Sequence, residues 1–373
     1  MRYLQSCVAD DLKKKMVFLG GPRQCGKTTL AKSLLKLHPG SYFNWDDDVH
    51  RRQLLARQWS DDARLVVFDE LHKFPRWKNW IKGIFDTRAG STSFLVTGSA
   101  RLDLYRRGGD SLLGRYHYWR LHPFGLDEKP AKMSDSEALS RLLHVGGFPE
   151  PFLDGDEREA RRWRRERVER VLKDDIRDLE SIKDVQTLSL FVDSLRQRVG
   201  GMVVLANIAN DLQVSPATCR RWLDALERMY LVFVIRPLQK GVPRALQKPP
   251  KVYFFDTGDV IGDEGARFEN FVATQLLKHC HFREDQDGHK YELCYIRDKE
   301  GREVDFAIVK DGVVTELYES KWSETGFDPA LRYYAERLSP KRAIQVVGTE
   351  RASFRQGLME RQSPFWFRRN PLL

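Results

Sequence analysis

The sequence predicts an α/β protein built from several domains, and three observations lead to this fold class. The chain has 373 residues, which at roughly 150 residues per domain is long for one compact fold. Short apolar runs alternate with helix-like stretches over residues 16–130, and strand-like runs return after residue 251. Hydrophobic residues make up 41% of the chain, as in proteins with packed cores. The expected segments are a parallel α/β core over residues 1–130, a helical lid or linker over 131–185, a helix-turn-helix domain with a hairpin over 186–250, and an α/β domain over 251–373.

The first two segments differ in pattern. The apolar runs Val17 to Leu19, Leu65 to Phe68 and Phe94 to Val96 are separated by helix-like stretches. This alternation is typical of parallel strands joined by crossover helices. From Ser134 to about Glu180 the sequence is helical in character, which predicts a lid or linker.

A phosphate-binding loop is predicted directly after the first strand. The pattern G-x-x-x-x-G-K-[ST] is matched by Gly21, Pro22, Arg23, Gln24, Cys25, Gly26, Lys27 and Thr28, and Thr29 opens the helix-like stretch that follows. Glycines let backbone amides close around phosphate oxygens, and the helix N-terminus adds positive charge. Lys27 would contact the β and γ phosphates and Thr28 the Mg²⁺. A glycine-rich turn without a ligand is the alternative, but the flanking strand and helix favour ATP with Mg²⁺.

Acidic and hydroxyl side chains follow the next two strands. Asp69 and Glu70 come directly after four apolar residues, so Asp69 is expected to help hold Mg²⁺ and Glu70 to polarise the attacking water. An acidic loop after a buried strand is the alternative. After the third strand, Ser99 or Thr97 would sense the γ-phosphate or the water, unless this segment is an ordinary serine-containing turn.

An arginine should complete phosphoryl transfer, and such a guanidinium is often supplied by a neighbouring subunit. Four candidates follow the third strand, at Arg101, Arg106, Arg107 and Arg115. Arg115 is favoured because the preceding apolar turn and glycine would hold it rigidly. The sequence therefore predicts a homo-oligomer, for which a hexameric ring is a candidate.

The middle of the chain predicts a helix-turn-helix. Residues 205–212 and 217–229 read as two helices, with Ser215 as N-cap of the second and Pro216 at its first position. The second helix would leave Thr218, Arg220 and Arg221 outside, where they could contact DNA. A basic run without acids then suggests the wing of a winged helix; it contains Arg236, Lys240, Arg244, Lys248 and Lys251. A helical adaptor that uses the same fold for protein contacts is the alternative.

The C-terminal segment contains a constellation typical of metal-dependent nucleases. Asp305 lies on one predicted strand, and Glu319 and Lys321 lie two apart on the return strand, so their side chains should meet on one face. Two carboxylates can bind Mg²⁺ while the lysine orients a water, and Glu269 on a preceding helix could complete the site. The alternatives are a solvated strand edge or a degenerate site that binds without cutting.

Net charge and hydropathy restrict the class of protein. The net charge is +10, with +9 in residues 1–130, +5 in 186–250, and −2 in each of the two other segments. This balance permits DNA as a partner without requiring it. The longest uninterrupted apolar run, Met229 to Ile235, is far shorter than the roughly 20 residues that cross a bilayer. Acids also replace the hydrophobic run of a secretory signal, so we expect a cytoplasmic protein without membrane contact.

These motifs together resemble a bacterial and archaeal family of AAA-type P-loop ATPases with a C-terminal PD-(D/E)xK nuclease-like domain. The resemblance covers nearly the whole chain, although Ser320 stands where that family commonly has an apolar residue. It implies an AAA-type core with a helical lid, a winged helix and a nuclease-like domain. The matching segments are residues 21–29, 68–77, 97–101, 146–150, 255–258 and 303–306.

Two functions fit the sequence. The first is an oligomeric ATPase that engages DNA and acts on it, or cuts it with the C-terminal site, in repair, recombination or defence. The second is a nucleotide-dependent switch or protein-remodelling ATPase whose winged helix and nuclease-like fold are interaction modules. ATP hydrolysis accelerated by DNA would distinguish the first from the second.

Overall fold

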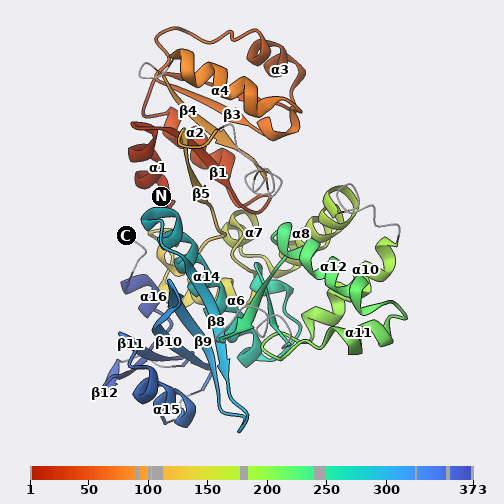
Figure 1. The fold of residues 1–373 in the computed structure, drawn as a ribbon, viewed down its shortest axis with the longest axis vertical. Coiled ribbons are helices and arrows are strands. Elements are labelled where there is room, and N and C mark those ends of the chain that lie inside the picture. The colour runs from red at the N-terminus through yellow and green to blue at the C-terminus, as the bar shows by residue number, and fades with distance from the viewer. Residues whose placement is uncertain are drawn as a thin grey trace. The chain divides into compact units, whose positions relative to one another are not determined.

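The computed structural model separates the chain into two compact units, residues 1–123 and 124–372 (Figure 1). The boundary precedes the expected one at residue 130 because residues 124–128 are fastened to the second unit. The amide of Phe124 donates to the carbonyl of Gly147, and Lys278 forms ion pairs with Asp127 and Glu128. The structure describes residues 2–88, 92–99, 102, 112–176, 184–238, 249–323, 326–349 and 353–370.

The first unit contains a parallel sheet, as predicted, and the sheet has five strands. Three of its strands are the predicted ones, whereas β2 and β5 were not anticipated. Strand β2 is half-exposed and contains glycine, serine and asparagine, so it lacks the apolar signature of a buried strand. The strand order is β2-β3-β4-β1-β5, with bounds Gly40–Asn44, Leu65–Asp69, Ser93–Thr97, Met16–Gly20 and Tyr116–Arg120.

Helices connect the strands of this unit and bury their apolar faces against the sheet. Asp47 caps α3, because its side chain accepts hydrogen bonds from the amides of Val49 and His50. The helices are α1 (Gln5–Leu12), α2 (Lys27–Leu35), α3 (Asp48–Leu55) and α4 (Trp77–Arg88), with a 3₁₀ turn at Leu71–Lys73.

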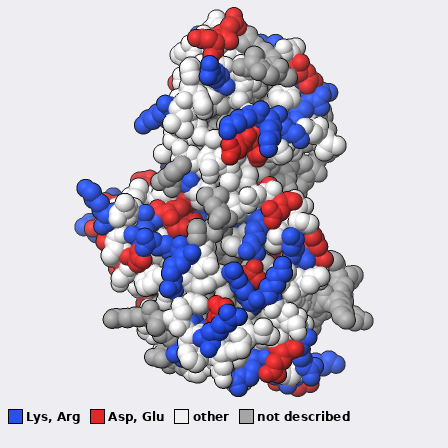
Figure 2. All heavy atoms as spheres, turned by 90° about the vertical axis from the view of Figure 1, so that its left-hand side faces the viewer, with Lys and Arg blue, Asp and Glu red and all other residues white. Residues whose placement is uncertain are grey.

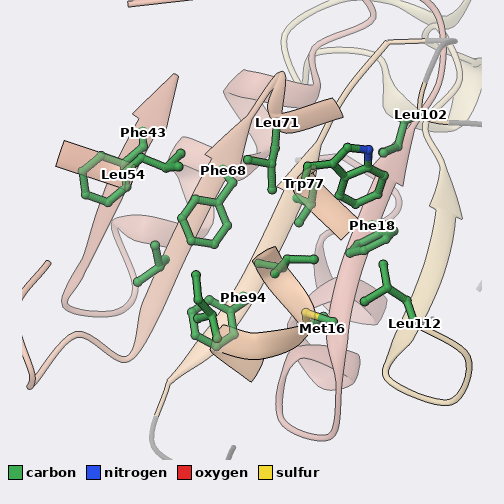
Figure 3. Packing of buried hydrophobic residues seen from close by; sticks show 14 of the residues in the cluster. Met16, Phe18, Phe43, Leu54, Phe68, Leu71, Trp77, Phe94, Leu102 and Leu112 are labelled. Atoms are coloured by element: carbon green, nitrogen blue, oxygen red, sulfur yellow. The ribbon is translucent and has the colours of Figure 1, made fainter. Parts of the chain in front are cut away.

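An aromatic cluster forms the core between the sheet and α4 (Figure 3). Phe68 on β3 stacks on Phe94 on β4, with ring centroids 5.9 Å apart. Phe18 on β1 lies 5.6 Å from Trp77 and 4.3 Å from Tyr116. Truncating a buried phenylalanine to alanine costs about 3–5 kcal/mol, so this cluster is a main source of stability for the sheet whose ends position the site.

The first half of the second unit is helical. Ser215 caps α12 as predicted, and its hydroxyl accepts from the amide of Thr218. No helix within the described ranges is both long and apolar enough to span a membrane. The helices are α6 (Asp135–His144), α7 (Pro149–Asp154), α8 (Glu157–Arg170), α10 (Val185–Arg196), α11 (Leu205–Asp211) and α12 (Pro216–Arg228), with a π-helical turn at Val171–Ile176.

An eight-stranded mixed sheet forms the second half of this unit. The order is β12-β13-β11-β10-β9-β8-β6-β7, with bounds Phe354–Gln356, Met359–Gln362, Arg342–Val347, Val313–Lys321, Glu303–Lys310, Tyr291–Arg297, Val232–Pro237 and Lys251–Phe254. The helices α14 (Glu264–Asp287), α15 (Pro329–Leu338) and α16 (Trp366–Arg369) accompany it, with 3₁₀ turns at Leu126–Glu128 and Thr257–Asp259.

The predicted wing belongs to this sheet. Strands β6 and β7 form an antiparallel hairpin, and β6 also pairs with β8 through Arg236 and Pro237. The hairpin therefore crosses the expected domain boundary at residue 250. Lys251, the last residue of the predicted basic run, has a side chain that is only 2% exposed.

A buried ion network joins the helices to the segment that follows β7. Asp259 pairs with Arg167 of α8 at 3.5 Å and with Arg196 of α10. Neighbouring Asp256 is fully buried and lies against Gly146, where an added Cβ would be 1.7 Å from its Oδ1. Burial and the charge of Asp259 raise the pKa of Asp256 to about 6. The close approach explains why a glycine with φ of 95° occupies position 146.

Asp256→Asn tests this buried carboxyl. Since the folded protein binds the Asp256 proton more tightly, wild-type stability should fall as pH rises from about 4 to about 6. The variant lacks this loss, so its free energy of unfolding relative to wild type should increase by about 1–2 kcal/mol between pH 4.5 and 7.5. Urea unfolding at both pH values measures this free-energy difference. Asp263→Asn, a substitution at an exposed N-cap residue, is the control. An equal effect of Asp256→Asn at both pH values would contradict the assignment.

Candidate functional site

The phosphate-binding loop connects β1 to α2, and two glycines determine its path. Gly21 has a φ of 133°, and a Cβ there would lie 2.3 Å from the carbonyl oxygen of Leu121. Gly26 is left-handed with a φ of 96° and is the N-cap residue of α2. Both positions require a residue without a side chain, so the loop can turn sharply and direct the amino end of α2 toward its ligand.

Lys27 is held against the loop that precedes it. Its Nζ donates to the carbonyl of Pro22 at 2.6 Å and to that of Gly21 at 3.1 Å, and the residue is only 7% exposed. These contacts keep the ammonium beside the loop amides. The charge and the amides can therefore act on the same phosphates, which fits the predicted role.

Contacts of Arg2 and Cys25 that sequence reasoning missed anchor the loop to the segment after β5. The Arg2 guanidinium donates to the carbonyls of Cys25 and His122. The Cys25 thiol lies 3.4 Å from the carbonyl oxygen of Leu121. Arg2 is distant in sequence from both acceptors, so only the tertiary structure identifies it as a support of the loop.

Asp69 accepts hydrogen bonds from hydroxyls on three different elements. Thr28 of α2 donates to Oδ2 at 2.8 Å, Tyr42 of β2 donates to the same oxygen at 2.6 Å, and Thr97 of β4 donates to Oδ1. Burial and the bond to Asp69 raise the pKa of Tyr42. Carboxylate and hydroxyl oxygens are ligands that Mg²⁺ prefers, so the chemistry of Thr28 and Asp69 fits the ion. Tyr42 was missed because β2 was not predicted.

Glu70 directly follows this carboxylate in a left-handed conformation, with a φ of 57°. Its Oε2 lies 3.2 Å from Nζ of Lys73, which also pairs with Asp46 at 2.5 Å. Lys73 therefore positions the predicted base. Of the two sensor candidates, Thr97 contacts Asp69, whereas Ser99 is buried just beyond the end of β4.

Arg115 and the phosphate-binding loop lie at opposite ends of the parallel strands. It precedes the amino end of β5, whereas the phosphate-binding loop follows the carboxyl end of the parallel strand β1. Its guanidinium pairs with Asp86 at 2.8 Å. The fold thus separates Arg115 from Lys27 of its own chain, and its action on a neighbouring subunit stays a prediction. The alternatives Arg101, Arg106 and Arg107 lie outside the described residues.

The predicted DNA-binding residues differ in their surroundings. Arg220 and Arg221 are exposed on α12, whereas the Thr218 hydroxyl is bonded to that of Ser215 at 2.9 Å. Lys240 and Arg244 lie outside the described residues. A groove of about 420 Å³ lies beside Arg220; its other lining residues are Val203, Val204, Leu205, Ala206, Pro216, Ala217, Pro249 and Pro250. This mostly apolar groove suits a protein contact as well as DNA.

The C-terminal constellation comes together around a lysine that was not among its predicted members. Asp305 on β9 and Glu269 on α14 both contact Lys251, at 3.3 and 3.2 Å. Glu319 on β10 accepts from the amide of Asp305 at 3.2 Å and from Lys321 at 2.7 Å. Burial and the charge of Asp305 raise the pKa of Glu319 to about 8, and burial raises that of Glu269 to about 6.

This arrangement does not fit a resident metal ion. The ammonium of Lys251 lies between carboxylates that were predicted to bind the ion. Across the part of the chain that the structure describes, no group of three or more His, Cys, Asp or Glu side chains is arranged to hold a metal. The geometry therefore gives no support to the predicted strand cleavage by Asp305, Glu319 and Lys321.

Comparisons with known proteins identify the first unit. Residues 13–129 match a family described as an AAA domain, while residues 136–260 and 264–362 match two families described only as domains of unknown function. An AAA-type P-loop domain thus accounts for the N-terminal part of the chain.

Full-length relatives are distant. An uncharacterized protein of Mycobacterium tuberculosis is 29% identical over 277 residues, which are 70% of this chain and 62% of that protein. One from Methanocaldococcus jannaschii is 21% identical over 332 residues, 80% of this chain and 73% of that protein. The chain thus spans 62% of the length of its mycobacterial relative.

Solved structures show only weak overall similarity. The RuvB Holliday junction branch migration motor of Thermotoga maritima is 16% identical, with 61% of this chain and 86% of that chain covered and a TM-score of 0.30. Bacteroides Pif1 bound to single-stranded DNA is 14% identical, with 38% and 45% covered and a TM-score of 0.22.

Substitutions should separate binding from turnover at the P-loop. Lys27→Ala should weaken ATP binding about tenfold to a hundredfold, because a charge-assisted hydrogen bond contributes about 1.5–3 kcal/mol. Glu70→Gln should leave ATP bound and slow its hydrolysis by about a hundredfold or more. Calorimetry with a non-hydrolysable ATP analogue and a phosphate-release assay measure the two effects. Lys36→Ala, at the exposed far end of α2, is the matched control. Equal loss of binding in both site variants would refute the role given to Glu70.

Proposed function

We propose that this protein is an oligomeric ATPase that hydrolyses ATP and uses the resulting rearrangement to act on DNA. The observation that carries the enzymatic part is the buried Asp69, joined to the phosphate-binding loop by Thr28 and followed directly by Glu70. A pair of oxygen donors and a second carboxylate beside a P-loop support the proposal, because water attack on a bound nucleotide needs a metal ligand set and a base.

Each residue of the proposed ATPase site has a distinct task. The loop amides and Lys27 hold the phosphates, and Thr28 and Asp69 would hold Mg²⁺, which supplies positive charge against the phosphate oxygens. Glu70 orients a water and accepts its proton. Thr97 links the end of β4 to Asp69, so a conformational change at the phosphates can be transmitted to β4. Lys73 orients Glu70 from outside.

DNA is the proposed partner because of the helix-turn-helix and its charges. Arg220 and Arg221 project from a helix whose opposite face is buried through Trp222, Leu223 and Leu226. Residues 186–250 carry a net charge of +5 in sequence. On the face shown in Figure 2, by contrast, acidic side chains are interspersed among basic ones. The α12 arginines are therefore the best-defined candidates for phosphate contacts.

The apolar groove beside Arg220 favours a second candidate function. A nucleotide-dependent switch or protein-remodelling ATPase would use this groove and the C-terminal sheet as interaction modules. Its hydrolysis rate would respond to a protein partner and not to DNA. Strand cleavage is outside the proposed function because Lys251 occupies the carboxylate cluster.

DNA should stimulate ATP hydrolysis, and the α12 arginines should be needed for this effect. Arg220→Ala/Arg221→Ala should lower DNA affinity for all sequences and reduce the slope of log affinity against log salt by about 1 per lost phosphate contact. Basal ATPase activity should persist. Hydrolysis is measured with single-stranded, duplex and branched DNA, with Arg161→Ala/Arg162→Ala as a control, since these arginines pair with Glu157 and Glu159. An ATPase that ignores all three DNAs would favour the protein-remodelling function.

Arg115 should act across a subunit interface. Arg115→Ala alone should lower turnover about a thousandfold or more, and Lys27→Ala alone should be inactive. A mixture of the two should regain part of the wild-type rate wherever an intact P-loop meets an intact arginine. Subunit exchange is followed independently by energy transfer between labelled chains. A mixture that exchanges subunits and stays inactive would place Arg115 outside the mechanism.

A further inference from the structure

Lys251 is a charged residue in a buried position. It is the first residue of β7, and its side chain is 2% exposed. Its Nζ lies 2.7 Å from Glu303, 3.2 Å from Glu269 and 3.3 Å from Asp305. An ammonium has three N–H donors, and here three carboxylates from α14 and β9 surround it. A lysine is buried this deeply only when it is paired.

Tyrosines complete the surroundings of this ammonium. The Tyr253 hydroxyl donates to the same Glu269 oxygen at 2.6 Å, and the Tyr295 ring centroid lies 5.8 Å from Nζ. The second oxygen of Glu269 faces Gly200, where an added Cβ would be 2.6 Å away. Glu269 is thus confined between the lysine and the turn at Gly200.

The remaining oxygens of Asp305, Glu303 and Glu319 also accept from protein donors. Asp305 Oδ2 accepts from the amide and hydroxyl of Ser320 at 3.0 and 2.8 Å. Glu303 Oε2 accepts from Arg297 at 2.6 Å. Both oxygens of Glu319 are occupied by the Asp305 amide and Lys321. Ser320, which replaces the commonly apolar residue, therefore directs an oxygen of Asp305 into the protein.

Cations of the protein already compensate most of the negative charge of the cluster without an added ion. Four carboxylates, those of Glu269, Glu303, Asp305 and Glu319, face three cations, Lys251, Arg297 and Lys321. A divalent cation would have to approach Lys251 and displace these donors, which like-charge repulsion opposes. Removing Lys251 would reverse the situation, because Glu269, Glu303 and Asp305 would remain as oxygen ligands without the cation that lies between them.

We propose that Lys251 is the built-in cation of this cluster, and that it excludes divalent metal from the C-terminal site. The cluster then acts as an internal ion-pair centre that joins β7, β9, β10 and α14, and the domain does not cut DNA. This inference is independent of the proposed ATPase function.

Mn²⁺ titration followed by electron paramagnetic resonance tests the inference. The full-length protein is used without nucleotide and with Asp69→Asn, so that the P-loop does not contribute. This parent should bind no Mn²⁺, whereas addition of Lys251→Met should create one site per chain. Lys251→Arg retains a cation and should stay metal-free. Addition of Asp305→Asn to the Lys251→Met protein should abolish the new site.

Two results would overturn the proposal. The first is Mn²⁺ binding by the Lys251-containing parent that Asp305→Asn removes, with or without metal-dependent DNA cleavage. The second is a folded Lys251→Met protein that binds no Mn²⁺, since charge would then not be what excludes the metal. If Lys251→Met fails to fold by circular dichroism, Lys251→Gln takes its place, and the parent measurement alone remains able to refute the proposal.

Discussion

The convergence of three hydroxyls on the buried Asp69 carboxylate organises the N-terminal domain. Thr28, Tyr42 and Thr97 come from α2, β2 and β4, so one side chain fixes the ends of three elements relative to one another. A buried carboxylate without such donors would be strongly destabilising. The glycines of the loop, the anchoring by Arg2 and the aromatic core beneath the sheet all serve to keep this meeting point in place.

The two carboxylate sites of the chain are satisfied in different ways. Asp69 accepts from neutral hydroxyls, which can bind a metal ion through their own oxygens while they remain close to the carboxylate. Asp305 and Glu269 accept from an ammonium, which has no lone pair to offer a metal. A carboxylate can therefore have surroundings that suit Mg²⁺ binding in one domain and surroundings that oppose it in the other. Donor chemistry, more than carboxylate spacing, distinguishes the two sites.

Sequence reasoning predicted the fold best where the residue pattern is local. The phosphate-binding loop, Asp69 and Glu70 lie within short motifs attached to apolar strands, so residue spacing defines the parallel sheet and the P-loop. Tyr42 was missed because β2 is half-exposed and has no apolar pattern. Lys251 was assigned to the basic run of the wing and not to the C-terminal site, because only the pairing of β6 with β8 shows that its hairpin enters the C-terminal sheet. Contacts between residues far apart in sequence leave no local signal.

The hairpin of β6 and β7 also limits where this chain can be divided into stable fragments. β7 is an edge strand of the eight-stranded sheet, and β6 lies between it and β8. A fragment that began at Lys251 would keep β7 without its partner and expose the backbone edge of β8, a template for aggregation. The helical segment is therefore joined to the sheet that follows it, and a fragment that keeps this sheet intact would need to begin upstream of Val232.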